Sequence, residues 1–178
     1  MNLGEMSVEE RRRVIVSTAR ECVGMPRELE RGFCYPFDSL VYAEQMMRHQ
    51  SRCALVALGI MRALGVDHPV LREPYASNVG KAVAWVVRIG NDLRCMADVG
   101  EVYPGDILVI GSVRGEHVLT VVGVDGDEVR SVDGGTGRIR EVARAMHDRK
   151  LIDRVMGARR INYRLALAES TAWSEVSG

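Results

Sequence analysis

Three side chains in the sequence could together perform thiol-based nucleophilic catalysis: a cysteine, a histidine and an aspartate. Cys53 follows Ser51, which can cap the apolar stretch beyond it, so Cys53 falls in the first turn of the expected helix. Unpaired backbone N–H groups and the positive end of the helix dipole favour the thiolate there. We therefore expect Cys53 to be a nucleophile, although the position also suits a plain buried cysteine.

The histidine and the aspartate occupy the ends of two strands that are expected to pair. His117 opens the apolar run that ends at Val124, and 125–127 turns the chain. A hairpin centred on the first two turn residues would bring Asp133 within a residue of the level of His117. An imidazole is the usual base for a thiol, and a carboxylate on its second nitrogen fixes the tautomer. The spacing therefore predicts a triad, whose third member depends on the strand register.

Other residues compete for roles in this chemistry. The candidate oxyanion donors are the backbone N–H of Cys53 and the side chains of Gln50, Tyr42 and Tyr35. His49 could serve as base only if one helix ran through it and Cys53, which the expected cap at Ser51 opposes. His68 and His147 are expected on the surface.

The elements that would position these residues come as helices first and strands afterwards. Helical patterns cover 7–23, 38 or 39 to 48, 52–64 and 77–89, and strand patterns cover 107–110, 117–124, 128–132, 138–142 and 161–167. This order favours an α+β fold in which N-terminal helices pack on a mostly antiparallel sheet. The helix over 52–64 is apolar almost all round and is expected at the centre of the domain.

Composition excludes several classes of protein. The 178 residues, 47% hydrophobic and 27% charged, fit one domain, expected over 1–167 with a helical extension at 1–30, a catalytic core at 50–140 and a flexible tail at 168–178. With 24 basic and 24 acidic residues there is no general attraction to nucleic acid, and no apolar run is long enough to cross a membrane. No CxxC or HExxH motif is present, so no metal or cofactor is expected.

The beginning of the chain bears on its destination. The arginines at 11–13 lie in a polar segment with no apolar signal region behind them, so no signal peptide is expected. The four cysteines are accordingly expected as reduced thiols, and the protein as cytoplasmic when synthesised. A role outside the cytoplasm would then require a signal-independent export route.

Several segments resemble a known family. A cysteine at the head of an apolar helix, followed in order by PGDILVIG, EHVLTVVGV and SVDGGTG, resembles the NlpC/P60 and CHAP branch of papain-like cysteine peptidases and amidases. The resemblance covers about 50–140 and implies a papain-like fold, with Cys53 as nucleophile, His117 as base and Asp133 as its orienting residue. It also implies peptidoglycan peptides as substrate. The chain reads SRCALV where NlpC/P60 members usually read DCSG or a close variant, which leaves the subfamily open.

The resemblance leads to an expected function and two alternatives. The expected protein is a cysteine hydrolase that cleaves an amide bond of cell-wall peptides through a thioester, either phage-derived or a secreted antibacterial effector with an immunity protein as partner. The same thioester chemistry permits deamidation of a protein glutamine or acyl transfer. A buried, unreactive Cys53 would instead leave a non-catalytic binding domain.

Overall fold

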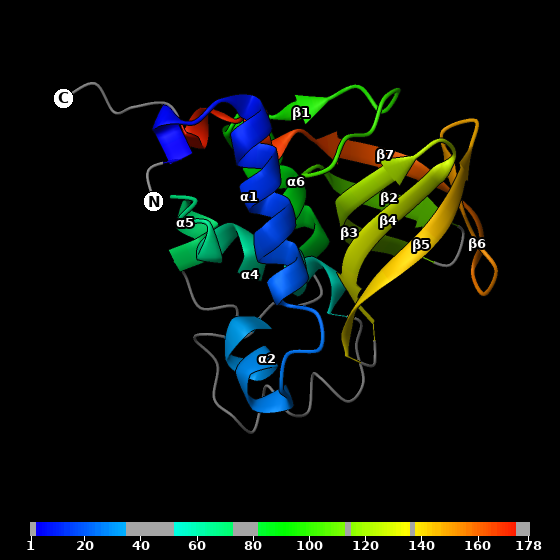
Figure 1. Ribbon diagram of the computed structural model, residues 1–178, viewed down its shortest axis with the longest axis horizontal. Helices are drawn as coiled ribbons and strands as arrows, with labels where there is room; N and C mark the ends of the chain where they lie inside the picture. Colours follow the sequence, from blue (N-terminus) through cyan, green and yellow to red (C-terminus); the bar gives the residue numbers. More distant parts are fainter. Residues whose placement is uncertain (1–2, 35–51, 73–81, 113–114, 136–137, 174–178) are drawn as a thin grey trace.

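Helices cover one side of an antiparallel β-barrel (Figure 1). The structure is a computed structural model that describes residues 3–34, 52–72, 82–112, 115–135 and 138–173. The helices are α1 (Val8–Glu21), α2 (Arg27–Cys34), α4 (Cys53–Ala63), α5 (Pro69–Arg72) and α6 (Ala82–Asp92), with short 3₁₀ turns at Leu3–Glu5, Leu167–Glu169 and Thr171–Trp173. The strands are β1 (Met96–Ala97), β2 (Ile107–Ser112), β3 (Gly115–Asp125), β4 (Glu128–Gly134), β5 (Ile139–His147), β6 (Lys150–Asp153) and β7 (Gly157–Leu165).

The sheet closes on itself because β7 pairs with two strands that lie on opposite sides of it. Within the described residues the strand order is β1-β7-β2-β3-β4-β5-β6, and β7 also pairs with β6. Six strands therefore form a closed antiparallel barrel, with β1 added beside β7. The prediction of a papain-like arrangement, with N-terminal helices packed on a mostly antiparallel sheet, is wrong, although the broad α+β class is compatible with this fold.

The error arises in the stretch 143–160, where the sequence pattern indicates no strand. In the structure β5 continues to His147, β6 occupies Lys150–Asp153, and β7 begins at Gly157 rather than at residue 161. The pairs of β6 with β5 and with β7 join the two edges of the sheet. Because β6 has only four residues, two of them charged, its strand conformation depends on its neighbours rather than on its own sequence.

Two apolar cores result from the alternation of side chains along the barrel strands. Along β2, Leu108 and Ile110 belong to the core inside the barrel, whereas Ile107 and Val109 belong to the core shared with the helices. α4 contacts α1, α2, α6, β3 and β4, and its residues from Cys53 to Met61 are all buried. This confirms the prediction of a central helix and explains why its sequence is apolar on all sides.

The remaining expected segments, namely the first helix, the two further helices and the C-terminal tail, agree with the structure to different degrees. α1 begins at a capping box, in which Ser7 Oγ accepts from the N–H of Glu10 at 3.3 Å and the N–H of Ser7 donates to Glu10 Oε2 at 2.8 Å. The helix expected over 77–89 corresponds to α6, while the helix expected from 38 or 39 to 48 lies outside the described residues. The segment expected to be a flexible tail packs as far as Trp173, whose Nε1 donates to the carbonyl of Leu167 at 2.6 Å.

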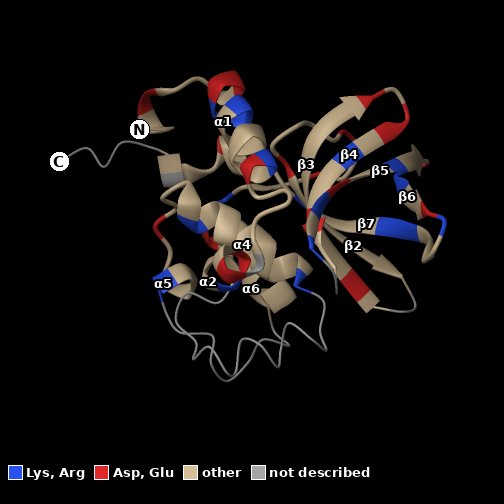
Figure 2. Cartoon of the chain, turned by 60° about the horizontal axis from the view of Figure 1, so that its bottom comes forward, with Lys and Arg blue, Asp and Glu red and all other residues tan. Residues whose placement is uncertain are grey.

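Charged residues of both signs are spread over the helices and the barrel (Figure 2). The described residues show no single basic face in this view, which agrees with the equal numbers of basic and acidic residues in the sequence. Among the helices that the structure describes, none combines the length and the apolar character needed to span a membrane.

Candidate active site

Cys53 is the first residue of α4, and its side chain is only 4% exposed. The first hydrogen bond of the helix runs from the N–H of Val56 to the carbonyl of Arg52 at 2.9 Å. The N–H groups of residues 53–55 precede this bond and point out of the helix start, together with the positive end of its dipole. Ser51, the expected cap, lies outside the described residues, and the structure has Arg52 at the cap position.

The start of α4 is held in place from two sides. The guanidinium of Arg52 forms an ion pair with Glu30 of α2, and both side chains are almost fully buried. On the other side α4 approaches the end of β4 so closely that a Cβ added at Gly134 would lie 2.7 Å from Cγ2 of Val56. A glycine at this position is therefore what allows Cys53 to sit against the barrel.

His117 links Cys53 to the barrel. Nε2 of His117 donates to Oδ2 of Asp133 at 2.9 Å. His117 also forms a hydrogen bond with the side chain of Cys53. Because Nε2 is used by Asp133, Nδ1 is the ring nitrogen left for Cys53. Burial by itself lowers the pKa of His117, but the hydrogen bonds and charges of Asp133 and Cys53 outweigh burial and raise the pKa to about 9. His117 is therefore an imidazolium at neutral pH, the form that stabilises a neighbouring thiolate.

Asp133 is 1% exposed and receives donors from two sides. His117 donates to its Oδ2, and the guanidinium of Arg144 on β5 donates to the same oxygen. Burial acts to raise the pKa of Asp133, but the hydrogen bond with His117 and the positive charge of Arg144 outweigh it and hold the pKa below its ordinary value. Asp133 is therefore an ionised acceptor that fixes the orientation of the imidazole.

A bulge in β3 places His117 and Asp133 on the same face of the barrel wall. Near the turn Gly123 pairs with Arg130, but beyond it Val121 pairs with Ser131 and Thr120 with Val132, so Val122 is an extra residue in β3. Continuing this register puts Asp133 opposite residue 119, two residues from His117 and on its side of the strand. His117 itself pairs with Ile110, whose side chain faces the barrel interior.

Not every predicted site residue can be placed. Gln50, Tyr42 and Tyr35, the candidate donors to an oxyanion, lie outside the described residues, as does His49. The prediction that concerns them stays a prediction. Of the predicted set, the structure brings together Cys53, His117 and Asp133.

The two histidines that the sequence places on the surface behave differently. His147 is exposed, with Nε2 3.4 Å from Asp148. His68 is only 4% exposed, so the prediction of a surface position is wrong for it. Its Nε2 lies 3.2 Å from Oδ2 of Asp92, and its Nδ1 accepts the N–H of Val70 at 3.2 Å. His68 is thereby committed to the first turn of α5.

The other cysteines provide a reference for Cys53. Cys22, Cys34 and Cys95 are buried free thiols, and burial raises their pKa values to about 11, about 12 and about 11. Cys22 donates to the carbonyl of Thr18 at 3.2 Å within α1. None of these three contributes to the hydrogen bonds of His117. Their protonated forms dominate at neutral pH, which makes them unreactive.

Arg144 is the residue of this cluster that the sequence pattern misses. It lies on β5, is 6% exposed, and donates through Nη1 to Ser131 Oγ at 2.6 Å as well as to Asp133. The pattern ends the strand at residue 142, so the arginine has no assigned direction. Val142, Arg144 and Met146 recur at the strand period of two, and this alternation is the signal that could have found it.

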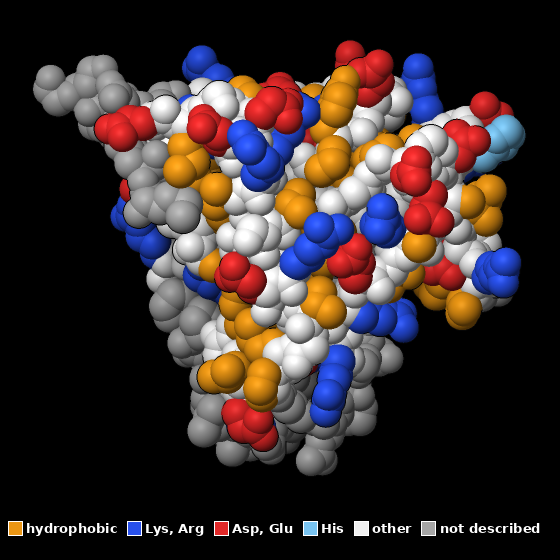
Figure 3. Space-filling view, viewed as in Figure 1, with side chains coloured by type: hydrophobic (Ala, Val, Ile, Leu, Met, Phe, Trp, Pro, Cys, Tyr) orange, Lys and Arg blue, Asp and Glu red, His pale blue; other side chains and the backbone are white. Residues whose placement is uncertain are grey.

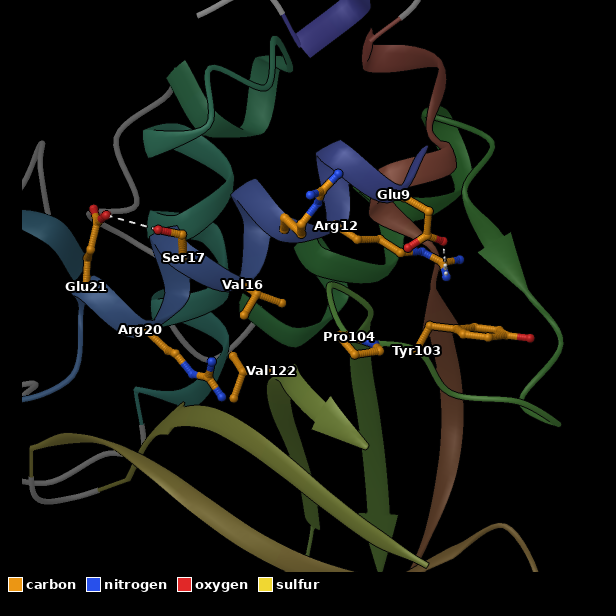
Figure 4. A pocket seen from close by; sticks show the side chains of 10 residues that line it. Glu9, Arg12, Val16, Ser17, Arg20, Glu21, Tyr103, Pro104 and Val122 are labelled. Atoms are coloured by element: carbon orange, nitrogen blue, oxygen red, sulfur yellow. Dashed lines mark hydrogen bonds and ion pairs between the residues drawn. The ribbon is translucent and has the colours of Figure 1, made fainter. Parts of the chain in front are cut away.

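A separate pocket of about 840 Å³ lies between α1 and the barrel, away from these residues (Figure 4). It is lined by Glu9, Arg12, Arg13, Val16, Ser17, Arg20, Glu21, Tyr103, Pro104 and Val122. Arg12 pairs with Glu9 at 3.4 Å and with Glu169 at 2.8 Å, and Arg20 pairs with Glu141 at 3.2 Å. The face that carries α1 shows the same mixture of basic and acidic side chains (Figure 3). Arg12 and Arg20, two cations of this lining, are therefore already engaged in ion pairs.

Two further observations bound the interpretation. Among the residues that the structure describes, no group of three or more His, Cys, Asp or Glu side chains could hold a metal ion. Comparison of the chain with family models, with curated proteins and with solved structures found no match. The geometry of Cys53, His117 and Asp133 is therefore what indicates the chemistry of the site.

Proposed function

We propose that the chain is a cysteine hydrolase that cleaves an amide bond through a thioester intermediate. The observation that carries the proposal is the continuous hydrogen-bonded series Cys53, His117, Asp133, with the thiol at the start of a buried helix. A thiol, a base and a residue that orients the base are the parts that covalent catalysis on a carbonyl requires. The raised pKa of His117 supports a resting thiolate–imidazolium pair.

The proposed reaction uses Cys53 as nucleophile, His117 first as acid and then as base, and Asp133 to orient His117. The Cys53 thiolate attacks the carbonyl carbon, and N–H groups at the start of α4 donate to the oxygen as it becomes negative. The tetrahedral intermediate expels the amine, which takes its proton from Nδ1 of His117, and a thioester remains on Cys53. Water then loses a proton to His117 and attacks the thioester, which releases a carboxylic acid and restores the thiol. Asp133 keeps its hydrogen bond with Nε2 throughout.

The proposed substrate is a cell-wall peptide. Its support is the resemblance of PGDILVIG, EHVLTVVGV and SVDGGTG to segments of peptidoglycan peptidases, and these segments form β2, β3 and β4 of the barrel wall at the site. The support comes from these residues and their order, and not from the fold, whose closed barrel differs from the arrangement that the resemblance implies.

Digestion of purified sacculi tests the substrate and the mechanism together. Wild-type protein is incubated with sacculi, and mass spectrometry of the soluble fragments should show new amine and carboxyl ends that Cys53→Ala does not produce. Cys22→Ala is the matched control, because it removes another buried thiol and should leave the fragments unchanged. Ammonia release from a protein substrate without chain cleavage would instead establish deamidation, and equal activity in Cys53→Ala would end the mechanism.

A further inference from the structure

Arg144 reaches the candidate active site from inside the barrel. It pairs with Val129 of the neighbouring strand β4, whose side chain belongs to the interior core, so the guanidinium lies on the interior face and extends along β4. There it donates to Ser131 Oγ at 2.6 Å and to Oδ2 of Asp133. The same Oδ2 lies 2.9 Å from Nε2 of His117, so one carboxylate oxygen joins the guanidinium and the imidazole.

The charges in this series alternate. When the Cys53 thiol is ionised and His117 is protonated, the order from α4 into the barrel is negative, positive, negative, positive. Without the guanidinium the buried cluster would carry an uncompensated negative charge, and the desolvated carboxylate of Asp133 would favour its protonated form. A protonated carboxyl group donates a hydrogen bond as well as accepting one, so it no longer specifies which nitrogen of His117 carries the proton.

We propose that Arg144 is a positioning residue for the catalytic pair: it acts through Asp133, which it holds ionised and oriented toward His117. This inference rests on the proposed function. It adds that the low-pH limit of thiol activation is set by an arginine of β5, which contacts neither Cys53 nor, in the proposed reaction, the substrate. The lowered pKa of Asp133, to which the charge of Arg144 contributes, is consistent with this role.

The pH dependence of Cys53 alkylation tests the inference without requiring a substrate. In Arg144→Met the acid limb of the iodoacetamide profile should move to higher pH, because Asp133 protonates more readily once the guanidinium is gone. On any cleaved peptide, kcat/KM at neutral pH should fall by about 100-fold, the loss expected when a catalytic group is misplaced. Arg144→Lys keeps a positive charge but loses the two-pronged contact, so it should restore part of both losses.

Arg159→Met is the matched control. Arg159 lies on β7, is 5% exposed, and pairs with Leu151 of the same interior core, so its loss removes an equally buried arginine that does not contact Asp133. Its acid limb should coincide with that of the wild type. A limb that moves equally in Arg144→Met and Arg159→Met would show that the barrel has merely been loosened, and would overturn the inference.

The failure of this inference can be told apart from the failure of the proposed function. If wild-type protein cleaves amides and folded Arg144→Met keeps both the wild-type limb and the wild-type kcat/KM, only the role of Arg144 is wrong. If the limb moves as expected but no amide is cleaved, the positioning role holds and the reaction is wrong. Should Arg144→Met fail to fold, Arg144→Lys decides, and an unmoved limb in that folded variant overturns the inference.

Discussion

A partly buried histidine, His117, and a buried one, His68, each contact an aspartate, yet the two pairs are built differently. His117 lies 2.9 Å from Asp133, whose side chain is 1% exposed, and His68 lies 3.2 Å from Asp92, whose side chain is 52% exposed. The first carboxylate is thus deprived of water and depends on protein donors, whereas the second is solvated. A short histidine–aspartate distance alone does not distinguish a candidate catalytic pair from a structural one.

The second nitrogen of each ring makes the larger difference. Nδ1 of His68 accepts the N–H of Val70, so this nitrogen is committed to a backbone hydrogen bond that stabilises the start of α5. The corresponding side of His117 faces the thiol of Cys53, and the two groups can exchange a proton. The comparison teaches that the partner of the second nitrogen assigns the role. The predictions below test this assignment.

Replacing each histidine by alanine should produce the largest contrast. His117→Ala should lower kcat/KM on a cleaved peptide by about 10³-fold, because it removes the general acid and base. His68→Ala should keep kcat/KM within about 3-fold but lower the free energy of unfolding by about 1–3 kcal/mol, because the N–H of Val70 loses its buried acceptor. Steady-state kinetics and urea unfolding measure the two effects. Comparable losses of kcat/KM in both variants would break the comparison.

Alkylation of the four cysteines should show a smaller but still large contrast. With pKa values of about 11 or 12, Cys22, Cys34 and Cys95 are thiolate in roughly one molecule in 10⁴ or fewer at pH 7. Iodoacetamide should therefore label Cys53 at least about 100-fold faster than any of them, and His117→Ala should lower that rate by about 10-fold or more. Peptide mass spectrometry after timed labelling gives each rate. His68→Ala should label like the wild type, and uniform labelling of all four thiols would count against activation.

The pH dependence of turnover should separate the two roles of His117. Because its pKa is raised to about 9, the imidazolium persists through neutral pH and is lost as the pH rises through about 9. Expulsion of the amine needs that proton, so kcat/KM should fall above this pH by about 10-fold per unit. The alkylation rate of Cys53 should not fall there, since the thiolate remains. A turnover that keeps rising to pH 10 would show that His117 is not the acid.

The sequence predicts the members of this site better than their geometry. Cys53 at a helix start and His117 at a strand start follow from capping and periodicity, which are local. The placement of Asp133 depends on register. The expected hairpin pairs it with residue 118, and the observed turn at Gly126 and Asp127, one residue later, would by itself pair it with residue 120; both positions lie on the opposite face of β3 from His117. The extra residue Val122 is what brings Asp133 and His117 onto one face, and nothing in the local sequence pattern indicates this bulge.

The barrel itself escapes prediction for a related reason. Its closure depends on β6, a strand of four residues that exists because β5 and β7 pair with it on either side. Local propensity cannot report a conformation that is imposed by neighbours distant in sequence. The sequence pattern also fails to identify Arg144 as part of the site. The pattern ends the strand before this residue, and the side on which a side chain lies cannot be assigned until its strand is known.

Asp92→Asn should have the smallest effect, and it sharpens the comparison from the solvated side. Asp92 is half-exposed and also lies 3.5 Å from Nε of Arg88, so its interaction with His68 is screened by water and shared with a second cation. The free energy of unfolding should fall by less than about 1 kcal/mol, and the difference from wild type should shrink in 0.5 M salt. Turnover should not change. A loss of unfolding free energy above about 2 kcal/mol that salt does not reduce would mean that water screens Asp92 no better than Asp133. The two histidine–aspartate pairs would then differ only in the partner of the second ring nitrogen of the histidine.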